Sequence, residues 1–315
     1  MKDIIAPVPT ELLKAELTDD KRLRFTNRGG NEIYIVTAFD APNVMREIGR
    51  LREIAFRAAG GGTGKDCDID EFDTMEVPYK QLIVWNPEND DIIGGYRFIY
   101  GRDIRYDENG TPMIATAHGM FRFSDQFKKE VLPYTLELGR AFVSVEYQST
   151  RMGAKSLFAL DNLWDGLGAL AVVLPGMKYY FGKVTMYPSY PTRARDMILY
   201  ILRTHFPDVD KLVEPVEPLQ LATDEAELAA IFCKDNFKEN YRILKQEIHD
   251  MDMVIPPMVS AYIGLSPAMR IFGTAVNYDF GNVEETGLLI PVDQIYEEKR
   301  MRYIDSFTES KTIEL

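Results

Sequence analysis

The 315-residue sequence predicts an α/β fold. Short segments rich in β-branched and aromatic residues alternate along the chain with amphipathic helical segments. The stretch Leu136–Ser156 adds a second observation, because an apolar strand there passes through a glycine-containing loop into an apolar helical run. The free N–H groups of the first turn of such a helix attract anions. We therefore take this stretch as the centre of the molecule.

The patterns divide the chain into four segments of one compact domain. Residues 1–31 form an N-terminal extension, 32–207 a core, 208–252 a helical insertion and 253–315 the completion of the core. The expected strands are Glu32–Thr37, Tyr79–Trp85, Ile92–Tyr100, one beginning at Tyr134, Tyr179–Tyr187, Thr274–Phe280 and Gly287–Pro291. The expected helices are Thr10–Glu16, Asn43–Ala59, Ser124–Lys129, Leu157–Met177, Thr192–Phe206, Glu225–Ile231, Lys238–Ile248 and Pro256–Phe272.

Composition excludes several classes of protein. Lys and Arg number 36 against 49 Asp and Glu, and a net charge of −13 argues against a general nucleic-acid binder. The first residues lack the apolar core of a signal peptide, and the apolar stretch Gly166–Met177 is too short to span a membrane. Two cysteines and three scattered histidines suggest a reducing compartment and no metal site. We expect a cytoplasmic protein.

Two charged residues interrupt the apolar strand at the centre. Glu137 and Arg140 are three positions apart and would face opposite sides of a regular strand. Gly139 lies between them, and glycine inside a strand often marks a bulge. One extra residue would bring both charges to one face, so we predict a bulge here. The two charges are then either a structural ion pair or a catalytic pair.

The helix predicted over Asn43–Ala59 is amphipathic. Its expected buried stripe is Val44, Ile48, Leu51, Ala55 and Ala58. Its expected solvated side carries Arg46, Arg50 and Arg57, which are also a place where an acidic partner could dock. Arg52 and Phe56 fall on the boundary of the stripe, where they either line a cleft or, for Arg52, lie along the surface with the charge in water.

The following loops carry two motifs that resemble ligand sites. Gly60–Lys65 is not a phosphate loop, because it lacks the first glycine and the closing Ser or Thr and follows a helix. The acidic run Asp66–Asp73 does not have calcium-loop spacing. Its carboxylates are expected in solvent, with Asp70 and Asp73 as candidates for a cleft.

Four short motifs resemble, in order, the signature of acyl-homoserine-lactone synthases, which have the GNAT acyltransferase fold. They are Arg52-x-x-x-Phe56, Asp70-x-x-Asp73, Gly94-Gly95-x-Arg97 and Glu137-x-x-Arg140. The second half is instead similar to N-acyltransferases of the ornithine-lipid and glycine-lipid type. The motifs there are Leu163–Leu167, Tyr180–Lys183, Ile255–Tyr262 and Asp279–Asn282. The resemblance spans roughly residues 32–295 and implies a GNAT-like mixed, twisted sheet with a splayed central strand and helices on both faces.

The resemblance also implies an activity: an N-acyltransferase that moves a fatty acyl chain, 3-hydroxylated in these families, from acyl carrier protein to the amine of glycine or ornithine. No cofactor would be bound permanently, since the donor is the acyl-phosphopantetheine of the carrier protein, or acyl-CoA. The product would be an N-acyl amino acid lipid, through which the protein could contact a membrane peripherally.

The resemblance assigns roles to specific residues. Glu137 would be the catalytic base and Arg140 its partner. The core 32–207 would hold the donor through Val143, Val145, Gln148, Arg151, Gly153 and Ala154. The acceptor would be bound by Arg52, Phe56, Asp70, Asp73 and Arg97.

Three other functions stay open. An acyl-homoserine-lactone synthase that uses S-adenosylmethionine fits the motifs of the first half but not those of the second. A non-catalytic acyl- or CoA-binding protein could keep the same fold. A membrane-lytic protein is disfavoured, because the sequence has no spanning segment and no strongly cationic amphipathic one.

Overall fold

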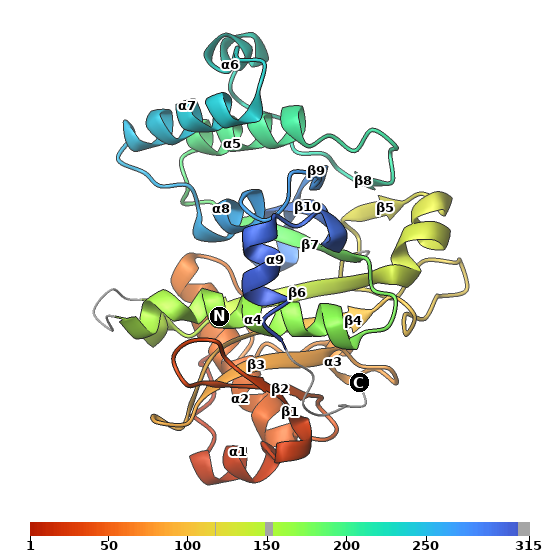
Figure 1. The fold of residues 1–315 in the computed structure, drawn as a ribbon, viewed down its shortest axis with the longest axis vertical. Helices are drawn as coiled ribbons and strands as arrows, with labels where there is room; N and C mark the ends of the chain where they lie inside the picture. Colours follow the sequence, from red (N-terminus) through yellow and green to blue (C-terminus); the bar gives the residue numbers. More distant parts are fainter. Residues whose placement is uncertain (117, 149–153, 308–315) are drawn as a thin grey trace.

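An eight-stranded sheet in the order β1-β2-β3-β4-β6-β7-β10-β9 forms the centre of the molecule (Figure 1). The computed structural model describes residues 1–116, 118–148 and 154–307, with the backbone alone for 154–157. The strands of this sheet are β1 (Arg22–Phe25), β2 (Glu32–Val36), β3 (Lys80–Asn86), β4 (Asp91–Tyr100), β6 (Thr135–Val143), β7 (Tyr179–Met186), β9 (Arg270–Asn277) and β10 (Val283–Pro291). Neighbours are antiparallel except β6 and β7, which run parallel. The predicted mixed sheet is confirmed.

Helices cover both faces of this sheet, as predicted. On one face, here called the α4 face, lie α4 (Ala154–Val173), α5 (Thr192–His205), α8 (Pro257–Ile263) and α9 (Glu297–Tyr303). On the other, the α2 face, lie α2 (Pro42–Ala59) and α1 (Thr10–Glu16). Strand residues alternate between the faces: Leu82 and Tyr96 pack in the core with α4, whereas Ile83 packs with α2.

Short elements complete the chain. The helix α3 (Glu71–Thr74) follows the acidic loop, and β5 (Phe121–Phe123) pairs with β8 (Val213–Pro215) in a separate two-stranded sheet. A π-helical turn covers Phe127–Val131, and 3₁₀ turns cover Asp19–Lys21, Leu132–Tyr134, Val145–Tyr147, Tyr278–Phe280 and Val292–Gln294. Among the helices of the described ranges, none is long and apolar enough to cross a lipid bilayer.

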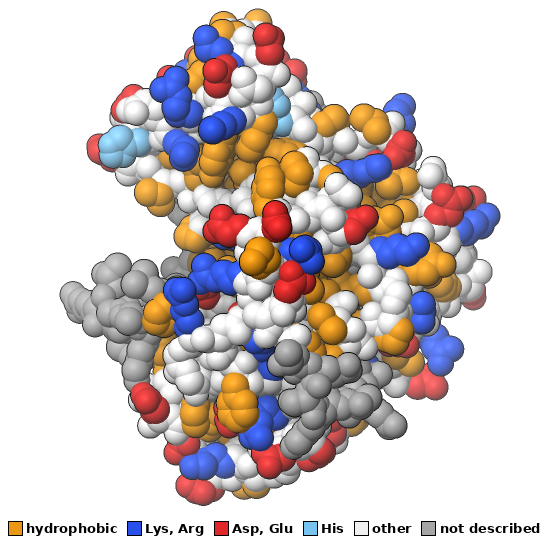
Figure 2. All heavy atoms as spheres, viewed as in Figure 1, with side chains coloured by type: hydrophobic (Ala, Val, Ile, Leu, Met, Phe, Trp, Pro, Cys, Tyr) orange, Lys and Arg blue, Asp and Glu red, His pale blue; other side chains and the backbone are white. Residues whose placement is uncertain are grey.

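The predicted insertion forms a helical layer on α5. Its helices are α6 (Glu225–Ile231) and α7 (Phe237–His249), whose buried residues join the core of the α4 face. We call α5, α6 and α7 the upper lobe, after their place in Figure 1. Figure 2 shows a notch in the outline of the molecule between the upper lobe and the part below it.

Most predicted elements are confirmed, and α1 and α6 have the predicted bounds. The helix expected over Pro256–Phe272 is wrong: α8 ends at Ile263, and β9 begins at Arg270. The segment between them contains Gly264 and Pro267, which interrupt a helix. β1, β5, β8, α3 and α9 were not expected, and β1 adds part of the N-terminal extension to the sheet.

Candidate active site

The two central strands separate partway along their length. β6 pairs with β7 only from Thr135 to Leu138, opposite Tyr179 to Gly182. Beyond that point β6 continues against β4 while β7 continues against β10. A cavity of about 580 Å³ is lined by both strands where they part, by residues 137–141 of β6 and 183–185 of β7. The predicted splay of the central strand is confirmed.

A bulge shapes β6 at the same place. Arg97 and Gly95 of β4, two positions apart, pair with Gly139 and Phe142 of β6, which are three positions apart. The extra residue lies where the sequence predicts a bulge, and Arg140 takes a left-handed conformation with φ of 49°. Glu137 and Arg140 both line the cavity, as expected if the extra residue brings the two side chains to the same face of the strand.

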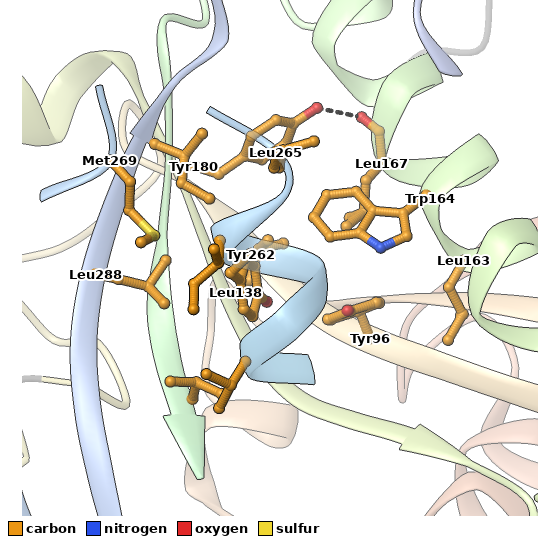
Figure 3. Close-up of a cluster of buried hydrophobic side chains, with 14 of the residues drawn as sticks. Tyr96, Leu138, Leu163, Trp164, Leu167, Tyr180, Tyr262, Leu265, Met269 and Leu288 are labelled. Carbon is orange, nitrogen blue, oxygen red and sulfur yellow. Dashed lines mark hydrogen bonds between the residues drawn. The ribbon is translucent and has the colours of Figure 1, made fainter. Parts of the chain in front are cut away.

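The cavity has a polar and an apolar wall. The polar wall belongs to the α2 face and contains Asp70, Arg97, Glu137, Arg140, Lys183 and Glu285. The apolar wall belongs to the α4 face and contains Tyr96, Leu138, Val184, Met258 and Tyr262. Figure 3 shows Tyr96, Leu138 and Tyr262 next to Trp164 of α4, whose ring lies edge-on to Tyr262 at 5.7 Å. Such a site can hold a charged group and an apolar chain on opposite sides of one strand.

Glu137 is a fully buried carboxylate with one free oxygen. The Thr116 hydroxyl donates a 2.5 Å hydrogen bond to Oε1, and the carboxylate also interacts with the Tyr79 hydroxyl; Oε2 makes no hydrogen bond of full geometry with any residue that the structure describes. Tyr79 lies beside this carboxylate. Burial raises the pKa of Tyr79 well above its ordinary value, and the negative charge of Glu137 raises it further, so the phenol stays protonated. Glu137 Oε2 is therefore a buried acceptor without a hydrogen bond on the polar wall.

The two arginines of the polar wall are held by aspartates. Arg97 Nη1 donates to both oxygens of Asp70 at 2.7 and 2.8 Å. Arg140 Nε lies 2.9 Å from Asp68 Oδ2, and its Nη2 lies 3.5 Å from Asp70. Within the described ranges no ion pair joins Arg140 to Glu137, which stand as separate charges in the same cavity.

Aromatic rings support Arg140 on its other side. Its guanidinium carbon lies 4.4 Å from the centre of the Phe280 ring, which also contacts Phe56 edge-on at 5.1 Å. Phe56 lines the cavity, as a cleft residue at this helix position should. A cation held between a carboxylate and an aromatic face keeps a fixed orientation.

Arg52 and Asp73 lie behind the polar wall and do not line the cavity. Both are fully buried. Arg52 Nη1 lies 3.4 Å from Asp73 Oδ2, Arg52 Nη2 donates to Gln81 Oε1, and Gln81 donates to Asp73 at 3.0 Å. The alternative in which the Arg52 charge reaches water is wrong, because buried partners from α3 and β3 surround it.

Asp73 connects this buried layer to the polar wall. Its carboxylate contacts Arg97 at 3.3 Å and, by accepting from the Asp70 N–H at 3.2 Å, caps the short helix α3. Burial alone would raise the pKa of Asp73, but the charges of Arg52 and Arg97 outweigh it and lower the pKa. Asp68 and Asp73 are thus buried in ion pairs, which corrects the expectation of a solvated acidic run.

The residues expected to hold a donor lie at the far end of β6. Val143 pairs with Gly94, Val145 opens a 3₁₀ turn, and the Gln148 side chain donates to the Val143 carbonyl at 2.7 Å. Ala154 is the first residue of α4, and Arg151 and Gly153 lie outside the described residues. The predicted order of strand, turn and helix start is confirmed.

Sequence reasoning missed several residues of the cavity. Lys183 Nζ pairs with Glu285 Oε2 at 2.6 Å. Burial opposes ionisation of Glu285, yet the charge and hydrogen bond of Lys183 lower its pKa. A signal existed, since Lys183 is the charged residue of the otherwise uncharged strand β7. Thr116 carries no such signal, because it lies in an irregular loop.

Comparison with known proteins agrees with this geometry. Residues 51–157 match the family model of the acetyltransferase (GNAT) domain. The chain is 66% identical over 310 residues to the glycine N(alpha)-acyltransferase of Bacteroides thetaiotaomicron, covering 98% of this chain and 92% of that protein. It is 64% identical over 307 residues to the protein of the same name from Phocaeicola vulgatus, covering 98% and 94%.

A solved structure gives a more distant likeness. The CoA-dependent acyl-homoserine lactone synthase BjaI, with SAM and isopentyl-CoA, matches with a TM-score of 0.38 and 11% identity over 86% of this chain and 87% of that one. From the two curated relatives, the chain belongs to the glycine N(alpha)-acyltransferase family of GNAT proteins, and it is an acyltransferase enzyme.

Proposed function

We propose that the protein joins a fatty acyl group to the α-amine of glycine and releases an N-acylglycine lipid. The relatives that are 66% and 64% identical are both named glycine N(alpha)-acyltransferases, which supports glycine as acceptor. The observation that carries the mechanism is the free oxygen of Glu137, in a cavity with one polar and one apolar wall. The donor is the acyl-phosphopantetheine of acyl carrier protein, with acyl-CoA as the alternative.

Glu137 acts as the general base in this proposal. The glycine amine is mostly protonated near neutral pH and must lose a proton before it attacks the thioester carbonyl. Glu137 Oε2 takes that proton, and the neutral amine attacks the thioester carbonyl to form the C–N bond. As the C–S bond breaks, the second proton of the nitrogen passes to the departing thiolate, which leaves the amide and the free thiol. General-base assistance of this kind is worth about 10²–10⁴-fold in rate.

Arg140 binds the carboxylate of glycine. Its guanidinium faces the cavity from the bulge, and its exposed side-chain fraction is 17%, against 3% for Arg97. Asp70 bridges Arg140 to Arg97, and Asp73 bridges Arg97 to Arg52 behind it. Phe56 lines the same cavity and contacts Phe280, the ring that supports Arg140.

The donor lies along the parted edge of β6. Beyond Leu138 this edge no longer pairs with β7, so its backbone groups can bond the amides of a pantetheine arm as an added strand does. The predicted phosphate cradle is the segment from Gln148 to Ala154 at the start of α4. The acyl chain then lies against the apolar wall.

Product analysis tests this proposal. Purified protein is incubated with acyl carrier protein charged with a 3-hydroxy fatty acid and with isotopically labelled glycine, and lipids are analysed by mass spectrometry. We expect N-acylglycine that carries the full isotopic mass of the glycine. Parallel reactions with ornithine and with acyl-CoA identify the preferred acceptor and donor. Absence of N-acylglycine with both donors, or preferential acylation of ornithine, would contradict the proposal.

A further inference from the structure

Helix α7 of the insertion carries a row of exposed basic side chains that the proposed chemistry does not use. Lys238, Arg242, Lys245 and, at the end of the helix, His249 are all exposed. At about 100° per residue they fall within an arc of about 60°. The buried residues Asn240, Leu244 and Ile248 hold another side of α7 against the rest of the protein. We call these four exposed residues the basic row.

The cations of the basic row form no ion pairs with the residues that the structure describes. Within the described ranges, no ion pair involves Lys238, Arg242 or Lys245. The neighbouring helix α5 differs, since Arg193 and Arg203 pair with Glu227 and Glu225 of α6 at 2.6 and 2.9 Å. Figure 2 shows basic side chains gathered on this part of the upper lobe. Unpaired cations side by side in a chain of net charge −13 favour an external acidic partner.

The other cationic helix surface is largely occupied internally. On α2, Arg50 pairs with Glu47 at 2.6 Å, and Arg57 pairs with Glu53 at 2.8 Å while donating to the Lys2 carbonyl at 2.7 Å. Only Arg46 of the three arginines considered from the sequence is exposed. The α2 surface is therefore a weaker docking candidate than α7.

The basic row is connected to the cavity by a short stretch of chain. His249 is nine positions from Met258, which lines the apolar wall together with Tyr262 of α8. At no more than about 3.6 Å per residue the two ends lie within about 32 Å, which is about the diameter of a small domain. Val254, in the connecting segment, is an apolar residue that is 72% exposed.

We propose that the basic row is the docking surface for the acidic acyl carrier protein that delivers the thioester. This inference rests on the proposed function, because it assigns the donor's protein part to the insertion. Opposite charges steer the encounter and set the orientation of the partner. An anionic membrane is the weaker partner, since the apolar side of α7 is buried within the protein and cannot enter a bilayer.

The test compares two triple charge reversals. One variant is Lys238→Glu, Arg242→Glu and Lys245→Glu. The control is Arg46→Glu, Arg105→Glu and Lys129→Glu, three exposed cations outside the upper lobe that change the net charge by the same amount. For each protein we measure transfer from acyl carrier protein, transfer from a small acyl-pantetheine thioester, and binding of the carrier protein by fluorescence anisotropy, at low and high salt.

The α7 variant should lose at least about tenfold in kcat/KM with carrier protein at low salt, with weaker carrier binding and unchanged use of the small thioester. The difference in kcat/KM between wild type and variant should shrink at high salt, because salt screens the attraction between the wild-type basic row and the carrier protein. Equal carrier binding by wild type and the α7 variant would overturn the inference, as would an equal loss in the control. Lost binding to anionic vesicles with unchanged carrier use would assign the row to a membrane instead. The anisotropy measurement reports carrier binding and does not depend on catalysis. A failure of the proposed function would be seen separately, as absence of N-acylglycine with every donor.

Discussion

Replacing Asp73 with Asn tests whether the buried charges behind the cavity hold it in shape. The carboxylate accepts from Gln81 Nε2 at 3.0 Å and lies 3.4 and 3.3 Å from Arg52 and Arg97. Every neighbour is a donor, so the amide N–H₂ of Asn would face another donor in either orientation. Breaking a buried ion pair from one side costs about 3–5 kcal/mol. At about 2.1 cal/mol/K of unfolding entropy per residue, Tm should fall by about 5–8 °C.

Urea unfolding and calorimetry of wild type and the Asp73→Asn variant measure this cost. The control is Asp305→Asn, which removes an exposed partner of Arg300 and should cost less than about 1 kcal/mol. The pKa of Asp73 is lowered in the folded state, so its stabilisation is present above its ordinary value near 3.9 and is lost as pH falls through the lowered one. The difference in free energy of unfolding between wild type and the Asp73→Asn variant should therefore become smaller only below about pH 4. A cost no larger than that of the control would refute this reasoning.

Two further variants probe the cavity itself. Thr116→Val removes the hydrogen bond to Glu137, worth about 1.5–3 kcal/mol to a charged group; kcat should fall while the KM for glycine stays the same, and an unchanged kcat would exclude Thr116 from orienting the base. Gly94→Ala places a Cβ 2.5 Å from the Phe142 carbonyl oxygen, so β4 and β6 must separate, at a cost of about 1–3 kcal/mol in urea unfolding and with loss of activity. Gly139→Ala is the control, because its Cβ meets no atom closer than 3.4 Å. Equal free energies of unfolding for the two variants would contradict this steric explanation.

Local patterns were sufficient to predict the frame of the site. The bulge in β6 was predicted from Gly139, which lies between the charged residues Glu137 and Arg140. In a regular strand these two side chains would face opposite sides of the sheet, and one extra residue brings them to the same side. The hairpin of β3 and β4 and the helix α2 follow from turn chemistry and periodicity.

Long-range partners explain what the sequence did not predict. Arg52 is buried only because Asp73 and Gln81, 21 and 29 positions away, meet it. Ala58 was expected in the buried stripe of α2 but is exposed, since the helix runs past its covering layer near its end. Thr116 reaches Glu137 from a loop whose path no local pattern encodes.

In the proposed mechanism, Glu137 removes the proton from the acceptor amine inside the opening between β6 and β7. The most direct measurement is the single-turnover rate of amide formation by the Glu137→Gln variant, with Glu130→Gln at an exposed position as control. Gln can keep the hydrogen bond from Thr116, so the fold and Tm should be unchanged. We expect a rate lower by on the order of 10²-fold for Glu137→Gln and no change for the control. A rate near wild type in a correctly folded Glu137→Gln protein would contradict this mechanism.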